Sequence, residues 1–69
     1  MATKEQYEMG ARNLAMRVRS TPDFENKERL MTYMGNLRYN QYKVTREGRA
    51  RNLAGNCYIA ARIFHLRAN

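Results

Sequence analysis

The sequence is poor in the residues that build disulfides, metal sites and membrane spans. It contains one cysteine, Cys57, and one histidine, His65, so an internal disulfide is excluded and a metal site would lack most of its usual ligands. No stretch approaches the roughly 20 apolar residues that cross a bilayer, and the first residues form no apolar signal segment. We therefore expect a cytoplasmic protein with no metal, no cofactor and no membrane partner.

Acidic residues are also scarce, and they are unevenly distributed. Thirteen lysines and arginines face six aspartates and glutamates, which gives a net charge of +7. Residues 1–34 hold six basic and five acidic side chains (net +1), whereas residues 35–69 hold seven basic and one acidic (net +6). Most of the basic residues are arginines, whose planar guanidinium suits phosphate and carboxylate groups. This asymmetry predicts a polyanion-binding surface in the second half of the chain.

The apolar residues recur at the spacing of α-helices. A first helix is predicted over residues 4–19, because four apolar side chains share one helical face there: Tyr7, Ala11, Leu14 and Val18. Thr3 and Gln6 fit a capping box at its start. After the break at Pro22, a second helix with Thr21 as its N-cap is expected to end near residue 39. Gly35 and the following asparagine are a turn signal, but the apolar arc of this helix continues through Leu37.

The last predicted helix, with Thr45 as its N-cap, runs to about residue 66 and is apolar on two sides. One face carries Ala50, Leu53, Cys57, Ala60, Ala61 and Phe64, and the opposite face carries Ile59, Ile63 and Leu66. A helix with two apolar faces is either central in a small bundle or contacts a partner on its second face, as in a homodimer. We predict a single small helical domain over residues 1–69, an all-α three-helix bundle with the long C-terminal helix at its centre.

The segment of residues 38–51 is the strongest candidate for a functional site. It combines five basic residues and two tyrosines with a single acid, Glu47. Cations neutralise phosphates, tyrosine rings stack on exposed bases, and the N-terminus of the last helix offers free backbone N–H groups to phosphate. The candidate nucleic-acid-binding residues are Arg38, Tyr39, Asn40, Tyr42, Lys43, Arg46, Arg49 and Arg51, with Arg62 and Arg67 as further phosphate contacts. The competing interpretation is a solvated connector whose arginines keep a small protein soluble.

A second hypothesis is a protein-binding modulator, an inhibitor or adaptor that docks on an acidic patch of a larger host protein. One helical face combines methionines with arginines. The other is an apolar stripe that could anchor a partner, with arginines as its rim. The candidate residues are Met9, Arg12, Met16 and Arg19 on the first helix, and Ile59, Ile63 and Leu66 on the last. Small basic helical proteins of this kind are often products of bacteriophages and mobile elements.

Catalysis is not expected. His65 has no predicted carboxylate or nucleophile beside it, and Cys57 lies on the apolar face, where a thiol is usually inert. The four glycines do not form a phosphate-binding loop. The sequence therefore predicts a non-catalytic binding protein, with nucleic acid as the first choice of partner and either DNA or RNA compatible with the pattern.

Overall fold

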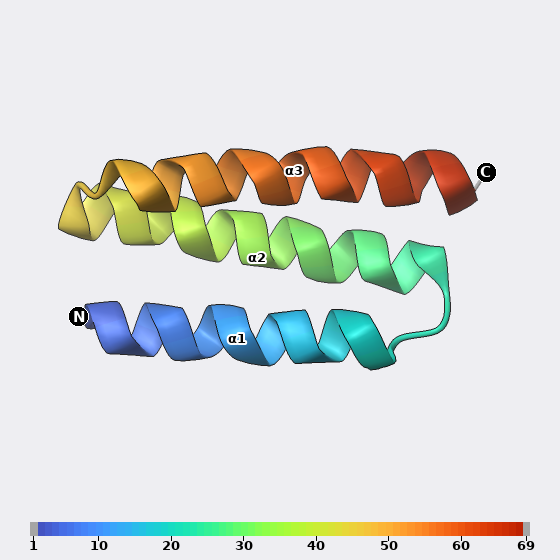
Figure 1. Ribbon diagram of the computed structural model, residues 1–69, viewed down its shortest axis with the longest axis horizontal. Helices are drawn as coiled ribbons and strands as arrows, with labels where there is room; N and C mark the ends of the chain where they lie inside the picture. Colours follow the sequence, from blue (N-terminus) through green and yellow to red (C-terminus); the bar gives the residue numbers. More distant parts are fainter. Residues whose placement is uncertain (1, 69) are drawn as a thin grey trace.

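The computed structural model describes residues 2–68, and these form three α-helices and no strand (Figure 1). The helices are α1 (Lys4–Ser20), α2 (Phe24–Thr45) and α3 (Gly48–Ala68), joined by short connections. The prediction of an all-α fold with three helices is confirmed. None of the described helices is long and apolar enough to cross a membrane.

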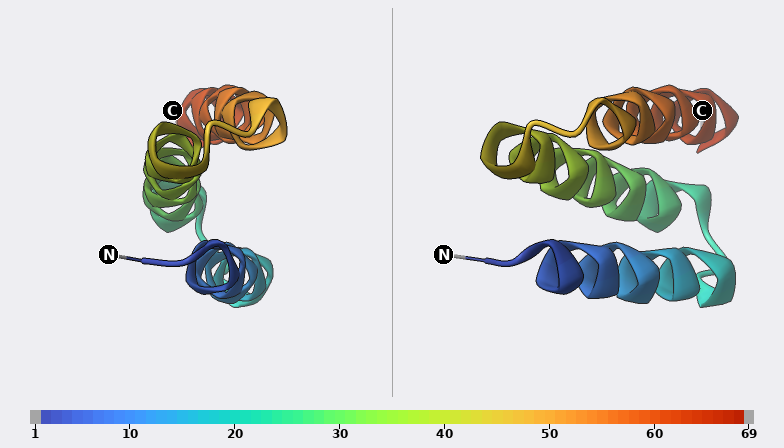
Figure 2. Two further views of the ribbon diagram at one scale, coloured as in Figure 1. Left: turned by 90° about the vertical axis from the view of Figure 1, so that its left-hand side faces the viewer. Right: turned by 60° about the vertical axis from the view of Figure 1, so that its left-hand side comes forward.

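The central helix is α2, not the C-terminal helix. α2 packs against both α1 and α3, whereas α1 and α3 do not pair with each other, and the end-on view shows them on either side of α2 in an open arc (Figure 2). The expectation that α3 is central is therefore wrong. It rested on the two apolar faces of α3, but only the face that carries Ala50, Ala54, Cys57 and Ala61 is buried.

The start of α1 follows the predicted local signals. The Gln6 backbone N–H donates to Thr3 Oγ1 at 3.3 Å, and the Thr3 backbone N–H donates to Gln6 Oε1 at 2.9 Å, which completes the capping box. Ala11 is buried, and Leu14 and Val18 pack beside it against the core. The predicted core stripe of the first helix therefore faces α2.

The N-cap of α2 is Asp23 rather than Thr21. An Asp23 carboxylate oxygen accepts the Asn26 backbone N–H at 3.1 Å, and the Asn26 side chain donates to the other oxygen at 3.0 Å. These two hydrogen bonds, the side-chain one first, lower the pKa of Asp23. Thr21 instead closes α1, because its hydroxyl donates to the Arg17 carbonyl. The aspartate two positions later accepts the first-turn N–H groups better than threonine does.

α2 also continues six residues past the predicted end and stops at Thr45. Gly35 lies within the helix and is buried, and the Tyr58 ring of α3 packs directly over it. The Tyr58 hydroxyl donates to Asn36 Oδ1 at 2.6 Å. The turn signal at Gly35 is thus a packing site between two helices. Arg46 caps the C-terminal end of α2, and its φ of 61° places it in the left-handed region.

Thr45 is the last residue of α2 rather than the N-cap of the next helix. Its hydroxyl donates to the Gln41 carbonyl at 2.9 Å and accepts the Glu47 backbone N–H at 3.3 Å. Thr45 therefore stabilises the connection between α2 and α3 from the C-terminal end of α2.

The core is made largely of small side chains. Its buried hydrophobic residues are Ala11, Leu30, Met34, Ala50, Ala54, Cys57 and Ala61. Alanines bury little area each but allow helix axes to approach closely. Apart from Leu30 and Met34, the large apolar side chains among residues 2–68 are partly buried or exposed, and Ile59 and Leu66 are among the exposed ones.

Candidate nucleic-acid interface

The basic segment of residues 38–51 forms a corner of the molecule, where α2 turns into α3. Residues 38–45 belong to the end of α2, Arg46 and Glu47 form the connection, and Gly48 begins α3. Tyr39, Tyr42 and Lys43 are therefore on a helix, where positions three and four apart share a face. The second helix was expected to end near residue 39, but this segment consists of two antiparallel helix ends that face each other.

Two tyrosines and three cations form what we call the corner cluster: Tyr39, Tyr42, Lys43, Arg46 and Arg51. The two tyrosine ring centroids are 6.1 Å apart with an interplanar angle of 45°. Lys43 Nζ lies 5.3 Å from the Tyr39 centroid, and the guanidinium carbon of Arg51 lies 5.8 Å from the Tyr42 centroid. Arg46 lies in the connection between α2 and α3, directly after Thr45, and is exposed. The rings thus hold two of the cations in fixed places at the surface.

The cations of the corner cluster have no acidic partner within the part of the chain that the structure describes. Lys43, Arg46 and Arg51 form no ion pair there. The one acid of the segment, Glu47, pairs with Lys4 of α1 at 3.3 Å instead. The positive charge of this corner is therefore available to an external anion.

Arg38 does not belong to this exposed surface. Its side chain is only 12% exposed and is paired with the Glu8 carboxylate of α1. The same guanidinium nitrogen donates to Gln41 Oε1 at 2.9 Å, and the fully buried Gln41 side chain donates to Glu8 at 3.2 Å. Arg38 and Gln41 therefore join α1 to α2, and the prediction that Arg38 contacts nucleic acid is at odds with this burial.

Glu8 is the acceptor at the centre of this network. The hydrogen bond from Arg38, followed by that from Gln41, lowers the pKa of Glu8, although partial burial acts in the opposite direction. Arg49 of α3 also approaches it at 3.4 Å, but the Arg49 side chain remains 64% exposed. Arg49 can consequently contact a ligand at the edge of the corner cluster while Glu8 compensates part of its charge.

Sequence reasoning missed this network because the partners are far apart in the chain. Glu8 precedes Arg38 by thirty residues, so no spacing within one helix connects them. The sequence did offer one signal for Glu8. It lies one helical turn before the buried Ala11, so it shares the side of α1 that faces α2. Of the other predicted residues, Asn40 is exposed on α2, and Arg62 and Arg67 lie further along α3.

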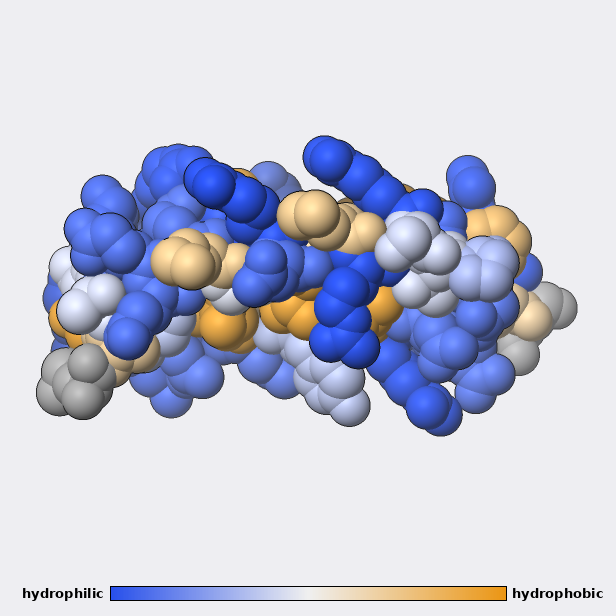
Figure 3. All heavy atoms as spheres, turned by 90° about the horizontal axis from the view of Figure 1, so that it is seen from below, coloured by the Kyte–Doolittle hydropathy of each residue, from blue (hydrophilic) through white to orange (hydrophobic). Residues whose placement is uncertain are grey.

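The faces considered for protein binding are at the surface. The α1 side is mostly hydrophilic, with separate hydrophobic patches between charged side chains (Figure 3). Met9, Arg12, Met16 and Arg19 are all exposed on α1. The second set, Ile59, Ile63 and Leu66, is exposed on α3.

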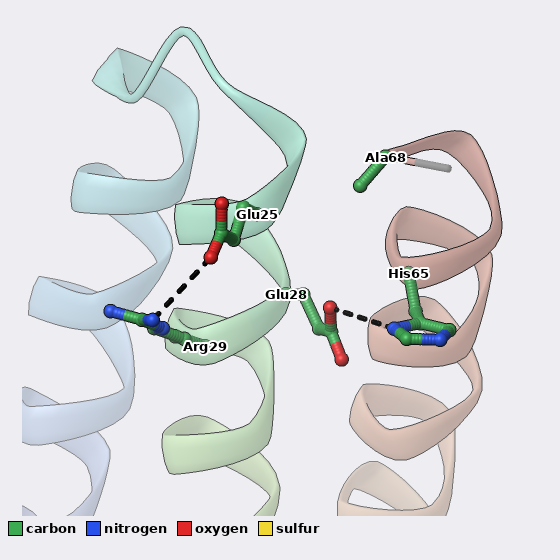
Figure 4. A pocket seen from close by; sticks show the side chains of 5 residues that line it. All are labelled: Glu25, Glu28, Arg29, His65 and Ala68. Carbon is green, nitrogen blue, oxygen red and sulfur yellow. Dashed lines mark hydrogen bonds and ion pairs between the residues drawn. The ribbon is translucent and has the colours of Figure 1, made fainter.

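A pocket at the opposite end of the molecule brings acidic and imidazole groups together (Figure 4). Glu25, Glu28 and Arg29 line it from α2, and His65 and Ala68 line it from α3. Glu28 Oε1 lies 3.1 Å from His65 Nδ1. The expectation that no carboxylate lies beside His65 is therefore wrong. The antiparallel pairing of α2 and α3 places the start of α2 beside the end of α3.

The single thiol, Cys57, does not line this pocket. Among residues 2–68, no group of three or more histidine, cysteine, aspartate or glutamate side chains is arranged to hold a metal ion. Cys57 is buried, and this burial raises the pKa of its thiol, against a smaller opposing effect of Arg38. A protonated, buried thiol is a packing group.

Comparison with known proteins found no matching protein family, no matching curated protein and no matching solved structure.

Proposed function

We propose that this protein is a small non-catalytic binding protein that associates with nucleic acid through the corner cluster. The observation that carries the proposal is the grouping of Lys43, Arg46 and Arg51 beside two tyrosines, without an acidic partner among the described residues. Free cations at one place on a surface attract the phosphate backbone, whose charge supplies most non-specific binding energy. A cytoplasmic location is part of the same proposal, since the single cysteine is a free thiol.

The arrangement favours contact with phosphates over the reading of bases. Cations already lie over the Tyr39 and Tyr42 rings, so these rings orient lysine and arginine groups instead of presenting two open faces to bases. Tyrosine hydroxyls and Asn40 supply further polar contacts to phosphate and sugar oxygens. Such contacts position a protein on a nucleic acid with little choice of sequence.

The salt dependence of binding tests this proposal. Each phosphate that is neutralised on duplex DNA lowers log K by about 0.9 per unit of log salt, so three contacts give a slope of about −2.7. We expect the affinity for a short fluorescent duplex to fall roughly 40-fold between about 50 and 200 mM salt. The same titration with duplex and single-stranded RNA compares the two nucleic acids. Undetectable binding at low salt, or a slope near zero, would contradict the proposal.

A further inference from the structure

The outer face of α3 is apolar and uncovered. Ile59, Ile63 and Leu66 share this face, and their exposed fractions are 62%, 46% and 63%. α3 packs against α2 through its opposite side, and neither of the other helices reaches the outer side (Figure 1). Large apolar side chains that recur at i, i+4 and i+7 are the anchors by which a helix binds another helix or a groove.

Gly55 adds a second, independent observation on the same face. Two of the other three glycines have a packing reason: a Cβ on Gly10 would lie 3.2 Å from a Leu37 methyl, and one on Gly35 would lie 2.7 Å from the Tyr58 ring. A Cβ on Gly55 would meet nothing within 4 Å. Glycine weakens a helix interior, so this position lowers stability without a compensating contact among residues 2–68. It lies one turn before Ile59, where it leaves open space beside the apolar anchors.

The charges around this face indicate the chemistry of what covers it. Arg62 and Arg67 lie on opposite edges of the apolar stripe and are exposed. α3 contains no aspartate or glutamate. A second copy of the chain would place two arginine-rich helices against each other, which like-charge repulsion opposes. A complementary surface has an apolar centre and an acidic rim.

We propose that the outer face of α3 docks an acidic amphipathic helix of another protein. Its apolar side chains pack on Ile59, Ile63 and Leu66, its backbone approaches closely over Gly55, and its rim carboxylates pair with Arg62 and Arg67. This surface is separate from the corner cluster, so the inference does not depend on nucleic-acid binding.

A peptide selection tests the charge and the site together. The probe is a display library of helical peptides with a fixed leucine stripe and random residues at the flanking positions, selected against the full chain. We expect aspartate and glutamate to be enriched at the flanks. We expect Ile63→Asn to weaken the selected peptide at least about tenfold, which is the effect of about 1.4 kcal/mol at an interface anchor. Circular dichroism checks that the variant keeps its helices.

Gly55→Ala separates a binding role from a folding role. Because nothing surrounds the added methyl in the free protein, we expect this variant to melt at a higher temperature than the wild type and yet to bind the peptide more weakly. Gly48→Ala is the matched control, since a Cβ there also meets nothing within 4 Å but lies at the start of α3. We expect Gly48→Ala to leave peptide affinity unchanged.

Several outcomes would overturn this proposal. Basic or uncharged flanks in the selected peptides would contradict an acidic partner. Peptide affinities of Ile63→Asn and Gly55→Ala equal to that of the wild type would contradict this binding site. A wild-type dimer in sedimentation that dissociates on Ile63→Asn would show that a second copy covers the face. Binding to phosphatidylglycerol vesicles that is lost on Ile63→Asn would assign the face to a membrane surface. Nucleic-acid binding by Ile63→Asn reports separately on the corner cluster.

Discussion

Arg38 and Arg51 belong to the same basic segment, but their surroundings give them different roles. Arg38 is buried against Glu8 and Gln41, where its charge fastens α1 to α2. Arg51 lies over the Tyr42 ring and faces solvent. A buried cation without its partner is strongly destabilising, whereas an exposed one contributes little to folding. At the residue scale, therefore, burial and pairing decide which arginines are available to a ligand.

Gly35 shows how one residue controls the contact between two helices. We expect Gly35→Ala to lower the free energy of unfolding by about 1–2 kcal/mol, because the added Cβ would lie 2.7 Å from the Tyr58 ring. This overpacking exceeds the gain of about 1 kcal/mol that alanine brings to a helix. Urea unfolding followed by circular dichroism measures the difference.

The sign of this effect distinguishes packing from helix propensity. In a Tyr58→Ala background the clash is removed, so we expect Gly35→Ala to stabilise the chain there. If Gly35→Ala were stabilising in the wild-type background as well, the close packing of Tyr58 over Gly35 would be contradicted.

At the scale of elements, α1 is attached by polar contacts with the other helices in addition to its core stripe. Glu8 receives hydrogen bonds from Arg38 and Gln41 and is approached by Arg49. Lys4 and Glu47 add an ion pair between α1 and the connection to α3. These contacts set the position of α1 on the same corner that carries the proposed interface.

We expect Glu8→Gln to lower the free energy of unfolding at neutral pH by about 1–2 kcal/mol, since Arg38 loses its counterion at a largely buried site. Because folding lowers the pKa of Glu8, its ionised form stabilises the fold above the unfolded value of about 4.5, and this contribution is lost as the pH falls through the lower folded pKa. The gap between wild type and variant should therefore close in acid. Chemical denaturation over a series of pH values measures it.

Glu25→Gln is the matched control for this prediction. Glu25 pairs with Arg29 at 3.5 Å, but both side chains are largely exposed. Such a pair contributes at most about 0.5 kcal/mol. An equal effect of the two substitutions, or a gap for Glu8→Gln that persists in strong acid, would count against the network.

Sequence patterns within one helix predicted its start and its buried face. The contacts between residues far apart in the chain were visible only in the structure. The capping box at Thr3 and the core stripe around Ala11 depend on neighbours within one helix, so spacing alone was sufficient. α2 runs through Gly35, over which the Tyr58 ring of α3 packs, and Arg38 is largely buried against Glu8 of α1. Both contacts join different helices, and no periodicity in one segment reveals them.

At the scale of the whole molecule, the open arrangement of the helices separates three regions. The three helices span 36 × 19 × 15 Å, with α2 between α1 and α3. The corner cluster lies at the end where α2 meets α3, the Glu28 and His65 pair lies at the other end, and the apolar stripe follows the outer side of α3. The high net positive charge promotes association with any polyanion. A test of the proposed interface must therefore separate the effect of where the charges lie from the effect of the net charge.

The most direct measurement compares two triple variants that lose the same charge. Lys43→Gln, Arg46→Gln and Arg51→Gln remove the cations of the corner cluster, and Arg12→Gln, Arg17→Gln and Arg19→Gln remove three exposed cations of α1. We expect only the first set to reduce the magnitude of the salt slope of duplex binding, by about 2.7 if all three contact phosphates. Equal losses of affinity and slope in both sets would show that net charge alone drives binding, and would contradict an interface at the corner.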